Sequence, residues 1–227
     1  MYVYAPPTPP SVAIRGSHAR FPVHRIYCVG RNYAEHAKEM GSTTGLETPT
    51  FFAKPADAVV ADGAEVPYPP ATSNLHHEVE LVLALGAGGA DIAPADALQH
   101  VYGYAVGLDL TRRDLQAAAK ARGGPWDTAK GFDHSAPVSA IAPAAEVGHP
   151  QRGLLWLDVN GERRQQADIG EMIFDPRACI AELSKFYRLA PGDLIYTGTP
   201  AGVGPLLRGD RYAAGFADIA RLEGRIA

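Results

Sequence analysis

The sequence predicts a mixed α+β fold that is rich in β-strands and contains a few short helices. The composition includes 24 Gly and 19 Pro among 227 residues, an excess that favours many turns over long helices. Most periodic segments are short and alternate apolar with polar residues, as strands do. A chain of this length buries roughly 70% of its unfolded surface, so it suits one large domain, with or without a short appendage.

The chain begins with a proline-rich stretch, residues 1–23, that we expect to form an extended arm. Its prolines cluster between positions 6 and 10, and each fixes φ near the value of extended backbone. We expect the arm to pack along the body, residues 24–227, or against a second subunit. The sequence has no secretory-signal pattern and no apolar run of the roughly 18 residues that a membrane helix needs. We therefore expect a cytoplasmic protein without membrane contact.

The first half of the body is expected to contain strands and one short helix. The helix follows the first strand, with Asn32 as its cap and Gly41 as its end. Loops and shorter strands fill the polar, proline-containing stretch before Asn74. The predicted strands of this half are residues 24–30, 76–86 and 101–110.

The second half is expected to add two helices and a hairpin. One helix runs from Thr111, as its cap, to Gly123, with Asp114 in the third position of a capping box. An Asn-Gly pair at 160 and 161 is the preferred two-residue turn between alternating strands, so residues 154–168 form a predicted hairpin. An Asp-Pro pair at 175 and 176 starts an amphipathic helix that reaches residue 189.

The net charge limits the kinds of partner that the protein can bind, and the cysteine content bears on disulfide formation. The net charge of −4 argues against nucleic acid, which requires a basic surface. A small anionic substrate stays compatible, because local Arg and Lys can outweigh the global sign. The two cysteines, Cys28 and Cys179, stand in apolar surroundings and are interpreted as buried thiols rather than a disulfide.

Three carboxylates form a candidate metal site. A strand places Glu78 and Glu80 on one face, roughly 6.5–7 Å apart along the backbone, and Asp109 ends the next strand. Carboxylates this close repel each other when desolvated, unless one takes a proton or a cation lies between them. Oxygen ligands suit Mg²⁺ or Mn²⁺ better than zinc. The alternative is a solvated strand face, with His76 and His77 as neighbours rather than ligands.

A second candidate is the pair His36 and Glu39, which a helix places on one face. A carboxylate that orients an imidazole makes a general base for activating water. The spacing also fits an H-x-x-E-H zinc-peptidase motif, but Met40 stands where the second histidine belongs. The remaining alternatives are an exposed helix face and Glu35 as a competing partner.

Seven separated segments occur together in one known arrangement. They are VGRNYAEHAKEMG, FFAKPADAVV, NLHHEVELVLALG, GYAVGLDLTRRDLQ, GPWDTAKGFDHSAPVS, VNGERRQ and GDLIYTGTPAGVGP. In this order they resemble the fumarylacetoacetate hydrolase family over residues 24–227, most of all its bacterial fumarylpyruvate hydrolases and then acylpyruvases. The resemblance implies a β-roll like the family's C-terminal domain, usually dimeric, with a divalent cation at its centre.

The resemblance also implies roles for individual residues. The three carboxylates hold the cation, and the His36–Glu39 pair lies on a segment that closes over the substrate and activates water. Lys130, in WDTAKGFD, is the catalytic lysine beside the metal. The residues implied to face the substrate are Arg31, Arg113, Gln116 and Thr199. Arg31 and Lys54 could instead anchor loops. The glycines of TGTPAGVGP are interpreted as a tight loop that closes the pocket, rather than as a P-loop.

The expected activity is metal-dependent hydrolysis of a carbon–carbon bond in a 2,4-dioxo acid, above all of fumarylpyruvate to fumarate and pyruvate. Such a reaction belongs to the breakdown of aromatic compounds through gentisate, an assignment that follows from the resemblance. The nearest alternatives keep the fold and metal but decarboxylate oxaloacetate, or isomerise or decarboxylate a dioic acid. A non-catalytic binding module for dicarboxylates is the alternative from another class.

Overall fold

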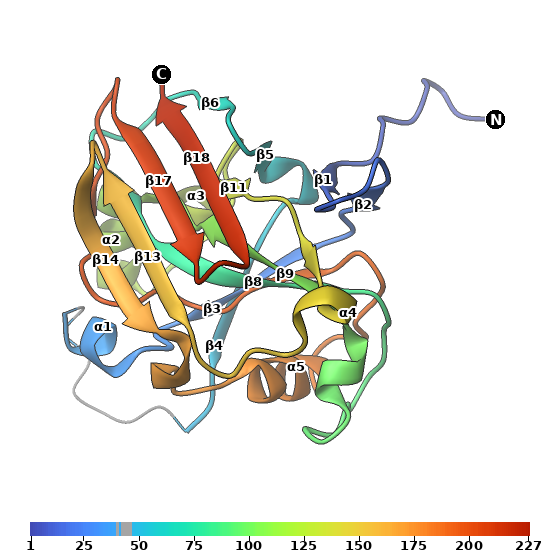
Figure 1. Cartoon of the computed structure of the whole chain (residues 1–227). Coiled ribbons are helices and arrows are strands. Elements are labelled where there is room, and N and C mark those ends of the chain that lie inside the picture. Colours follow the sequence, from blue (N-terminus) through green and yellow to red (C-terminus); the bar gives the residue numbers. More distant parts are fainter. Residues whose placement is uncertain (40, 42–46) are drawn as a thin grey trace.

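The computed structural model describes residues 1–39, 41 and 47–227 of the chain. The two largest β-sheets of its body pack against each other, with short helices around them (Figure 1). The predicted β-rich fold class is confirmed. Of the described helices, none combines the length and the apolar character that crossing a bilayer requires.

The larger sheet has eight strands and carries the centre of the molecule. In spatial order its strands are β4 (Thr50–Lys54), β3 (Ile26–Gly30), β15 (Leu194–Tyr196), β8 (Val79–Leu85), β9 (Val101–Leu108), β11 (Ala136–Val138) and β5 (Val59–Ala61), and β12 (Ala142–Pro143) pairs with β9 beside this path. Every residue of β8 is buried. The sheet therefore has protein on both of its faces, which explains why β8 is a nearly continuous apolar run.

The smaller sheet has five strands and covers one face of the larger one. Its strands are β14 (Glu162–Asp168), β13 (Leu154–Val159), β17 (Arg211–Phe216), β18 (Ala220–Ile226) and β6 (Glu65–Val66). Strand β13 contacts β8, and both β17 and β18 contact β9. The predicted hairpin at 154–168 is confirmed as β13 and β14, and its turn residues Asn160 and Gly161 have φ values of 52° and 81°.

The remaining elements are short. Two further sheets contain β1 (Ser11–Ala13) with β2 (Arg20–Pro22), and β10 (Thr111–Arg112) with β7 (Leu75–His77) and β16 (Gly204–Pro205). The α-helices are α1 (Ala34–Glu39), α2 (Arg113–Arg122), α3 (Asp127–Lys130), α4 (Ala144–Val147) and α5 (Pro176–Ser184), and 3₁₀ turns lie at Ala56–Ala58, Ala97–His100 and Ile169–Glu171.

The second half of the predicted arm is packed along the body. Strands β1 and β2 form a small hairpin whose Val12 and Phe21 are buried. Its turn is tied to the larger sheet, because Arg15 and Ala13 exchange backbone hydrogen bonds with Ile141 at 2.8 Å each. Residues 1–9 are exposed. The boundary at residue 23 and a contact of the arm with a second subunit stay predictions.

Two predicted helix caps are wrong. Thr111 belongs to β10, which pairs with β7, so α2 begins two residues later at Arg113 and has no side-chain cap. The Asn32 amide lies between two distant segments, because it donates to Thr197 O at 2.7 Å and to Phe174 O at 2.8 Å. In both cases tertiary pairing outweighs the local capping preference.

Other predicted local features agree with the structure. Gly123 ends α2 in the left-handed region with φ of 67°, as a glycine after a helix does. Asp175 caps α5 by accepting a hydrogen bond from Ala178 N at 2.8 Å, although this helix ends at Ser184, before residue 189. Cys28 and Cys179 are buried free thiols, as predicted.

Candidate active site and metal centre

The three candidate carboxylates lie together at one end of β8 and β9. Glu78 joins β7 to β8, Glu80 lies in β8, and Asp109 directly follows β9. These strands pair antiparallel with Val79 opposite Leu108, so Asp109 comes to lie beside Glu78, and its backbone N–H donates to the Glu78 carbonyl at 2.8 Å. Oxygen atoms of the three side chains lie within 4.8 Å of one another. Strand register thus assembles the cluster.

The cluster is shielded from solvent. Glu78 is 5% exposed, Glu80 is 1% exposed and Asp109 is fully buried. The alternative interpretation of a solvated strand face is therefore wrong, since these carboxylates and every residue of β8 are buried. Neither neighbouring histidine belongs to the cluster: His76 Nδ1 accepts from Arg113 Nε at 3.3 Å, and His77 Nδ1 donates to a glutamine at 2.9 Å.

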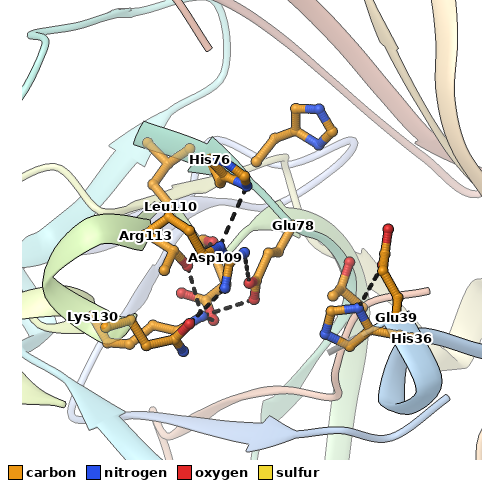
Figure 2. Close-up of polar contacts among 12 residues, drawn as sticks. His36, Glu39, His76, Glu78, Asp109, Leu110, Arg113 and Lys130 are labelled. Atoms are coloured by element: carbon orange, nitrogen blue, oxygen red, sulfur yellow. Dashed lines mark hydrogen bonds and ion pairs between the residues drawn. The ribbon is translucent and has the colours of Figure 1, made fainter. Parts of the chain in front are cut away.

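Cationic side chains lie around two of these carboxylates (Figure 2). Lys130 Nζ pairs with Glu78 Oε2 at 2.7 Å and also with Asp109. Arg113, from the first turn of α2, pairs with the other oxygen of Glu78. In the described part of the chain, no cationic side chain lies within ion-pair distance of Glu80. Glu78 and Asp109 are thus neutralised by protein groups, and Glu80 is not.

Lys54 also belongs to this network. The sequence alone did not decide whether it faces the substrate or anchors a loop. Its ammonium lies 2.8 Å from Asp109 Oδ1, and the side chain is fully buried. It also donates to the backbone carbonyl of Leu110 at 3.1 Å and to that of Lys130. Lys54 therefore contacts the centre of the site from β4, and it holds together the two segments that carry Asp109 and Lys130.

The surroundings drive the pKa values of the two glutamates apart. Burial raises the pKa of Glu78, but the positive charges of Lys130 and Arg113 outweigh it and hold this pKa well below its ordinary value. Burial, followed by the negative charges of Asp109 and Glu78, raises the pKa of Glu80 well above its ordinary value. The backbone N–H of the TGTP loop that donates to Glu80 Oε2 at 2.7 Å offsets only part of this. Glu80 is the carboxylate that a further cation would relieve.

The donor set fits a divalent cation. All three side chains supply oxygen, which Mg²⁺ and Mn²⁺ prefer over nitrogen or sulfur. Asp109 Oδ1 accepts no well-directed hydrogen bond among the described residues, although the Lys54 ammonium lies near it. Glu80 carries the repulsion described above. The cluster of Glu78, Glu80 and Asp109 can therefore bind a divalent metal ion.

The predicted pair His36 and Glu39 meets on α1, on the other side of the pocket (Figure 2). His36 Nδ1 lies 3.2 Å from Glu39 Oε2. A carboxylate only accepts, so Nδ1 carries the hydrogen and Nε2 is the proton acceptor. Burial lowers the pKa of His36 below 6.5, and the charges of Glu78 and Glu39 offset this in part. The imidazole is thus neutral near pH 7, the state that a general base requires. Met40, which breaks the zinc-peptidase motif, lies outside the described residues.

One pocket brings the predicted site residues together. Nine of the ten line it, and Glu39 lies behind His36. Those nine are Arg31, His36, Glu78, Glu80, Asp109, Arg113, Gln116, Lys130 and Thr199. Gln116 contributes through its neighbour, because its Oε1 accepts from Arg113 Nη1 at 2.6 Å. The roles of these residues stay predictions, but their convergence from five separate segments of the sequence is a fact of the fold.

Gln165 supports the pocket from the smaller sheet, a role that no part of the sequence reasoning assigned. Its amide donates to Thr199 Oγ1 at 2.8 Å and to Pro200 O at 2.9 Å. Its carbonyl oxygen accepts from His77 Nδ1 and, at 3.1 Å, from Val79 N. Gln165 thus joins the TGTP loop to the strand of the metal cluster. Its position at the end of the VNGERRQ segment, which resembles the family, was the one feature of the sequence that could have indicated this role.

Comparisons with known proteins agree with this arrangement. The family model for the fumarylacetoacetate hydrolase C-terminal domain matches residues 25–227. The chain belongs to the fumarylacetoacetate hydrolase family. It is 48% identical over 190 residues to the mitochondrial oxaloacetate tautomerase FAHD1 of Mus musculus, and the matched region covers 84% of this chain and 86% of that protein. It is 45% identical over 179 residues to the fumarylpyruvate hydrolase of a Ralstonia species, with 79% and 90% covered.

A solved structure extends the comparison to the fold. The crystal structure of fumarylpyruvate hydrolase from Pseudomonas aeruginosa in complex with Mn²⁺ and pyruvate superposes with a TM-score of 0.98 at 48% identity. The match covers 100% of this chain and 99% of that one. This chain is accordingly an enzyme of the family with the fold of its C-terminal domain. The relatives from M. musculus and Ralstonia are named for different activities, oxaloacetate tautomerisation and fumarylpyruvate hydrolysis.

Proposed function

We propose that this enzyme hydrolyses a carbon–carbon bond in a 2,4-dioxo acid, with fumarylpyruvate as substrate and fumarate and pyruvate as products. The observation that carries the proposal is the opposition, across one pocket, of a carboxylate cluster suited to a divalent cation and a neutral, carboxylate-oriented histidine. The similar P. aeruginosa structure was solved with Mn²⁺ and pyruvate, one of the two expected products. Mg²⁺ or Mn²⁺ is the proposed cofactor, held by Glu78, Glu80 and Asp109.

The reaction begins with water. When bound, the cation supplies positive charge at the 2-oxo-acid end of the substrate. His36 takes a proton from water through Nε2 while Glu39 holds its Nδ1–H, and the resulting hydroxide attacks the 4-oxo carbon. The positive charge of Lys130 stabilises the oxyanion that forms there, and the Thr199 hydroxyl donates a hydrogen bond to it. Donors of this kind typically contribute about 10²–10³ in rate each.

Cleavage follows from that intermediate. The bond between carbon 3 and carbon 4 breaks, carbon 4 becomes the new carboxylate of fumarate, and the electron pair leaves as the enolate of pyruvate. Carbon 3 takes a proton to give pyruvate, and the sum is one water consumed for each bond broken. Arg113, with Gln116 bound to its guanidinium, neutralises negative charge beside Glu78 throughout.

Tautomerisation of oxaloacetate is the second candidate. It is favoured by the relative of M. musculus, whose name states this activity. That reaction moves a proton between carbon 3 and the 2-oxo oxygen and needs a base but no attacking water, so the neutral His36 serves it equally well. Decarboxylation of oxaloacetate requires the same charge stabilisation and remains the further alternative on this site.

Product analysis with a panel of substrates distinguishes these activities. Purified enzyme with Mg²⁺ or Mn²⁺ is mixed with fumarylpyruvate, acetylpyruvate or oxaloacetate. We expect rapid loss of the dioxo-acid absorbance with equimolar fumarate and pyruvate, abolished by a chelator. Activity confined to oxaloacetate would contradict the hydrolase. In that case keto–enol exchange without CO₂ would identify a tautomerase, and release of CO₂ a decarboxylase.

The oligomeric state, the cellular location and the pathway of the enzyme are also proposals. We propose a cytoplasmic homodimer that takes part in the catabolism of aromatic compounds and has neither nucleic acid nor membrane as partner. Support comes from the family resemblance and from the acidic net charge of −4. Sedimentation equilibrium with twice the chain mass of 24.1 kDa is the expected result for the dimer, and a single chain mass would exclude it.

A further inference from the structure

One face of α2 extends away from the metal cluster along the pocket. Arg113, Gln116 and Lys120 line the pocket together, and their spacing of three and then four residues places them on one side of a helix. Arg113 at the start of α2 pairs with Glu78. Lys120 lies seven residues further on, about 10 Å along the helix axis. The pocket thus has a carboxylate cluster near one end of α2 and a lysine near the other.

Lys120 differs from the other cations of the pocket in its partners. Lys130 and Arg113 each form ion pairs with the carboxylate cluster. Lys120 and Arg31 form none within the described part of the chain, and the undescribed residues 40 and 42–46 include no Asp or Glu. The aromatic ring of Trp126, 5.3 Å from Lys120 Nζ, is an apolar wall of the same pocket. Two positive groups therefore share this end without a protein carboxylate between them.

The surroundings make this arrangement costly without an anion. Lys120 is half-buried, and burial together with the charges of Arg31 and Arg113 lowers its pKa, which the negative charge of Glu78 offsets only in part. Arg31 has φ of 61°, a left-handed conformation that side chains with a Cβ rarely adopt. The alternative is a surface lysine that only packs its aliphatic stem against the Trp126 ring. That alternative does not explain why Lys120 lines the pocket close to the positive charge of Arg31. Backbone strain and unpaired charge of this kind are typical of ligand sites.

Charges across the pocket are complementary to a ligand with two anionic ends. Three carboxylates and the cations Lys54, Lys130 and Arg113 balance formally at the cluster, so a bound divalent ion leaves that end positive. Lys120 and Arg31 make the other end positive as well. A monoanion with an apolar tail would leave the second pair unpaired, whereas a dianion neutralises both ends.

We propose that Lys120, with Arg31, forms a second anion subsite that binds the distal carboxylate of a dicarboxylic substrate. Through it the enzyme selects acylpyruvates with a carboxylate at the far end of the acyl group over those that end in a methyl group. This inference rests on the proposed function for the identity of the reacting end. It adds a specificity-determining residue that acts on the non-reacting end of the substrate.

The decisive variant is Lys120→Met, which keeps the unbranched stem against Trp126 and removes the charge. We expect kcat/KM for fumarylpyruvate to fall about tenfold to a hundredfold, the usual value of a charged hydrogen bond. For acetylpyruvate, which ends in a methyl group, it should stay within about twofold. Lys120→Arg should retain most of the preference. Lys185→Met is the matched control, since Lys185 pairs with Glu182 on the exposed surface of the α5 end.

A binding measurement separates this inference from the proposed reaction. Calorimetry on Mn²⁺-loaded enzyme compares 2-oxoglutarate with 2-oxopentanoate, which share a carbon chain length and a 2-oxo-acid end but differ in the distal carboxylate. The wild type should bind 2-oxoglutarate at least tenfold more tightly, and Lys120→Met should lose that preference.

The two experiments fail in different ways. A preference that Lys120→Met leaves unchanged overturns the subsite, even if fumarylpyruvate is hydrolysed. Equal losses on fumarylpyruvate and acetylpyruvate likewise overturn it, because they indicate a general structural role. A preference lost in Lys120→Met, in an enzyme that does not hydrolyse fumarylpyruvate, supports the subsite and refutes the proposed reaction.

Discussion

Replacing Lys54 with Met tests whether this buried lysine belongs to the centre of the site or only anchors a loop. The ammonium has three partners: the Asp109 carboxylate at 2.8 Å, the Leu110 carbonyl at 3.1 Å and the carbonyl of Lys130. Both ionic side chains are fully buried. Methionine matches the length of the stem, so the change removes charge and donors while it fills most of the volume.

The expected loss of stability follows from these contacts. Removing one partner of a buried ion pair costs about 3–5 kcal/mol, because the other charge remains buried. Asp109 keeps its ion pair with Lys130, which favours the lower end of that range. The carbonyls of Leu110 and Lys130 each lose a hydrogen-bond donor, which adds to the loss of stability. For a chain of this size, each kcal/mol lowers Tm by about 2–4 °C. We therefore expect a decrease in Tm of about 6–20 °C.

Urea denaturation and calorimetric melting of the metal-free enzyme measure this loss. Mn²⁺ should recover part of it, because a cation beside Asp109 neutralises the charge that Lys54 leaves behind. Lys185→Met, which breaks an exposed pair, should change the free energy of unfolding by only about 0–1 kcal/mol. A Lys54→Met variant within about 1 kcal/mol of wild type, with no dependence on metal, would refute this account of Lys54.

The remaining predictions concern the chemistry of the site. His36→Ala should lower kcat about 10²–10⁴-fold while Mn²⁺ affinity stays within threefold, and nearly intact turnover would exclude this base. Because the neutral imidazole is the base and burial lowers its pKa, kcat/KM should fall only as pH decreases through a value below 6.5. Glu39 raises the pKa of His36, so Glu39→Gln should move that acidic limb to lower pH; an unmoved limb would contradict the pairing. Mn²⁺ binding should release protons at pH values below the pKa of Glu80, which burial and the charges of Asp109 and Glu78 raise. Binding enthalpies that do not depend on the ionisation enthalpy of the buffer would contradict this, as would unchanged Mn²⁺ affinity in Glu80→Ala.

The sequence could predict the parts of the site that depend on local geometry. Two glutamates two residues apart in an extended segment lie on one side of it, and so do a histidine and a glutamate three residues apart on a helix, whatever the rest of the fold does. Asp109 was within reach of prediction because it ends an apolar strand. Its contact with Glu78 depends on the register of β8 and β9, which no spacing in the sequence determines. The family resemblance implied only that the three carboxylates hold one cation.

The contributions from distant elements could not be predicted in this way. Lys54 comes from an edge strand of the larger sheet, Gln165 from the smaller sheet and Lys120 from the last turn of α2, and their contacts exist only after the sheets have packed. Thr111 shows the same limit at the local level. Its sequence context favours a helix cap, but pairing of β10 with β7 makes it a strand residue whose hydroxyl accepts from Lys130 Nζ at 2.7 Å.

Metal-dependent hydrolysis is tested most directly by mass spectrometry of the products that metal-stripped and Mn²⁺-reloaded enzyme form from fumarylpyruvate in H₂¹⁸O. Hydrolysis through an activated water predicts one heavy oxygen in the newly formed carboxylate of fumarate, and fumarate only from the reloaded enzyme. Absence of fumarate from the reloaded enzyme would contradict the hydrolase, and undiminished formation by the stripped enzyme would contradict its dependence on metal.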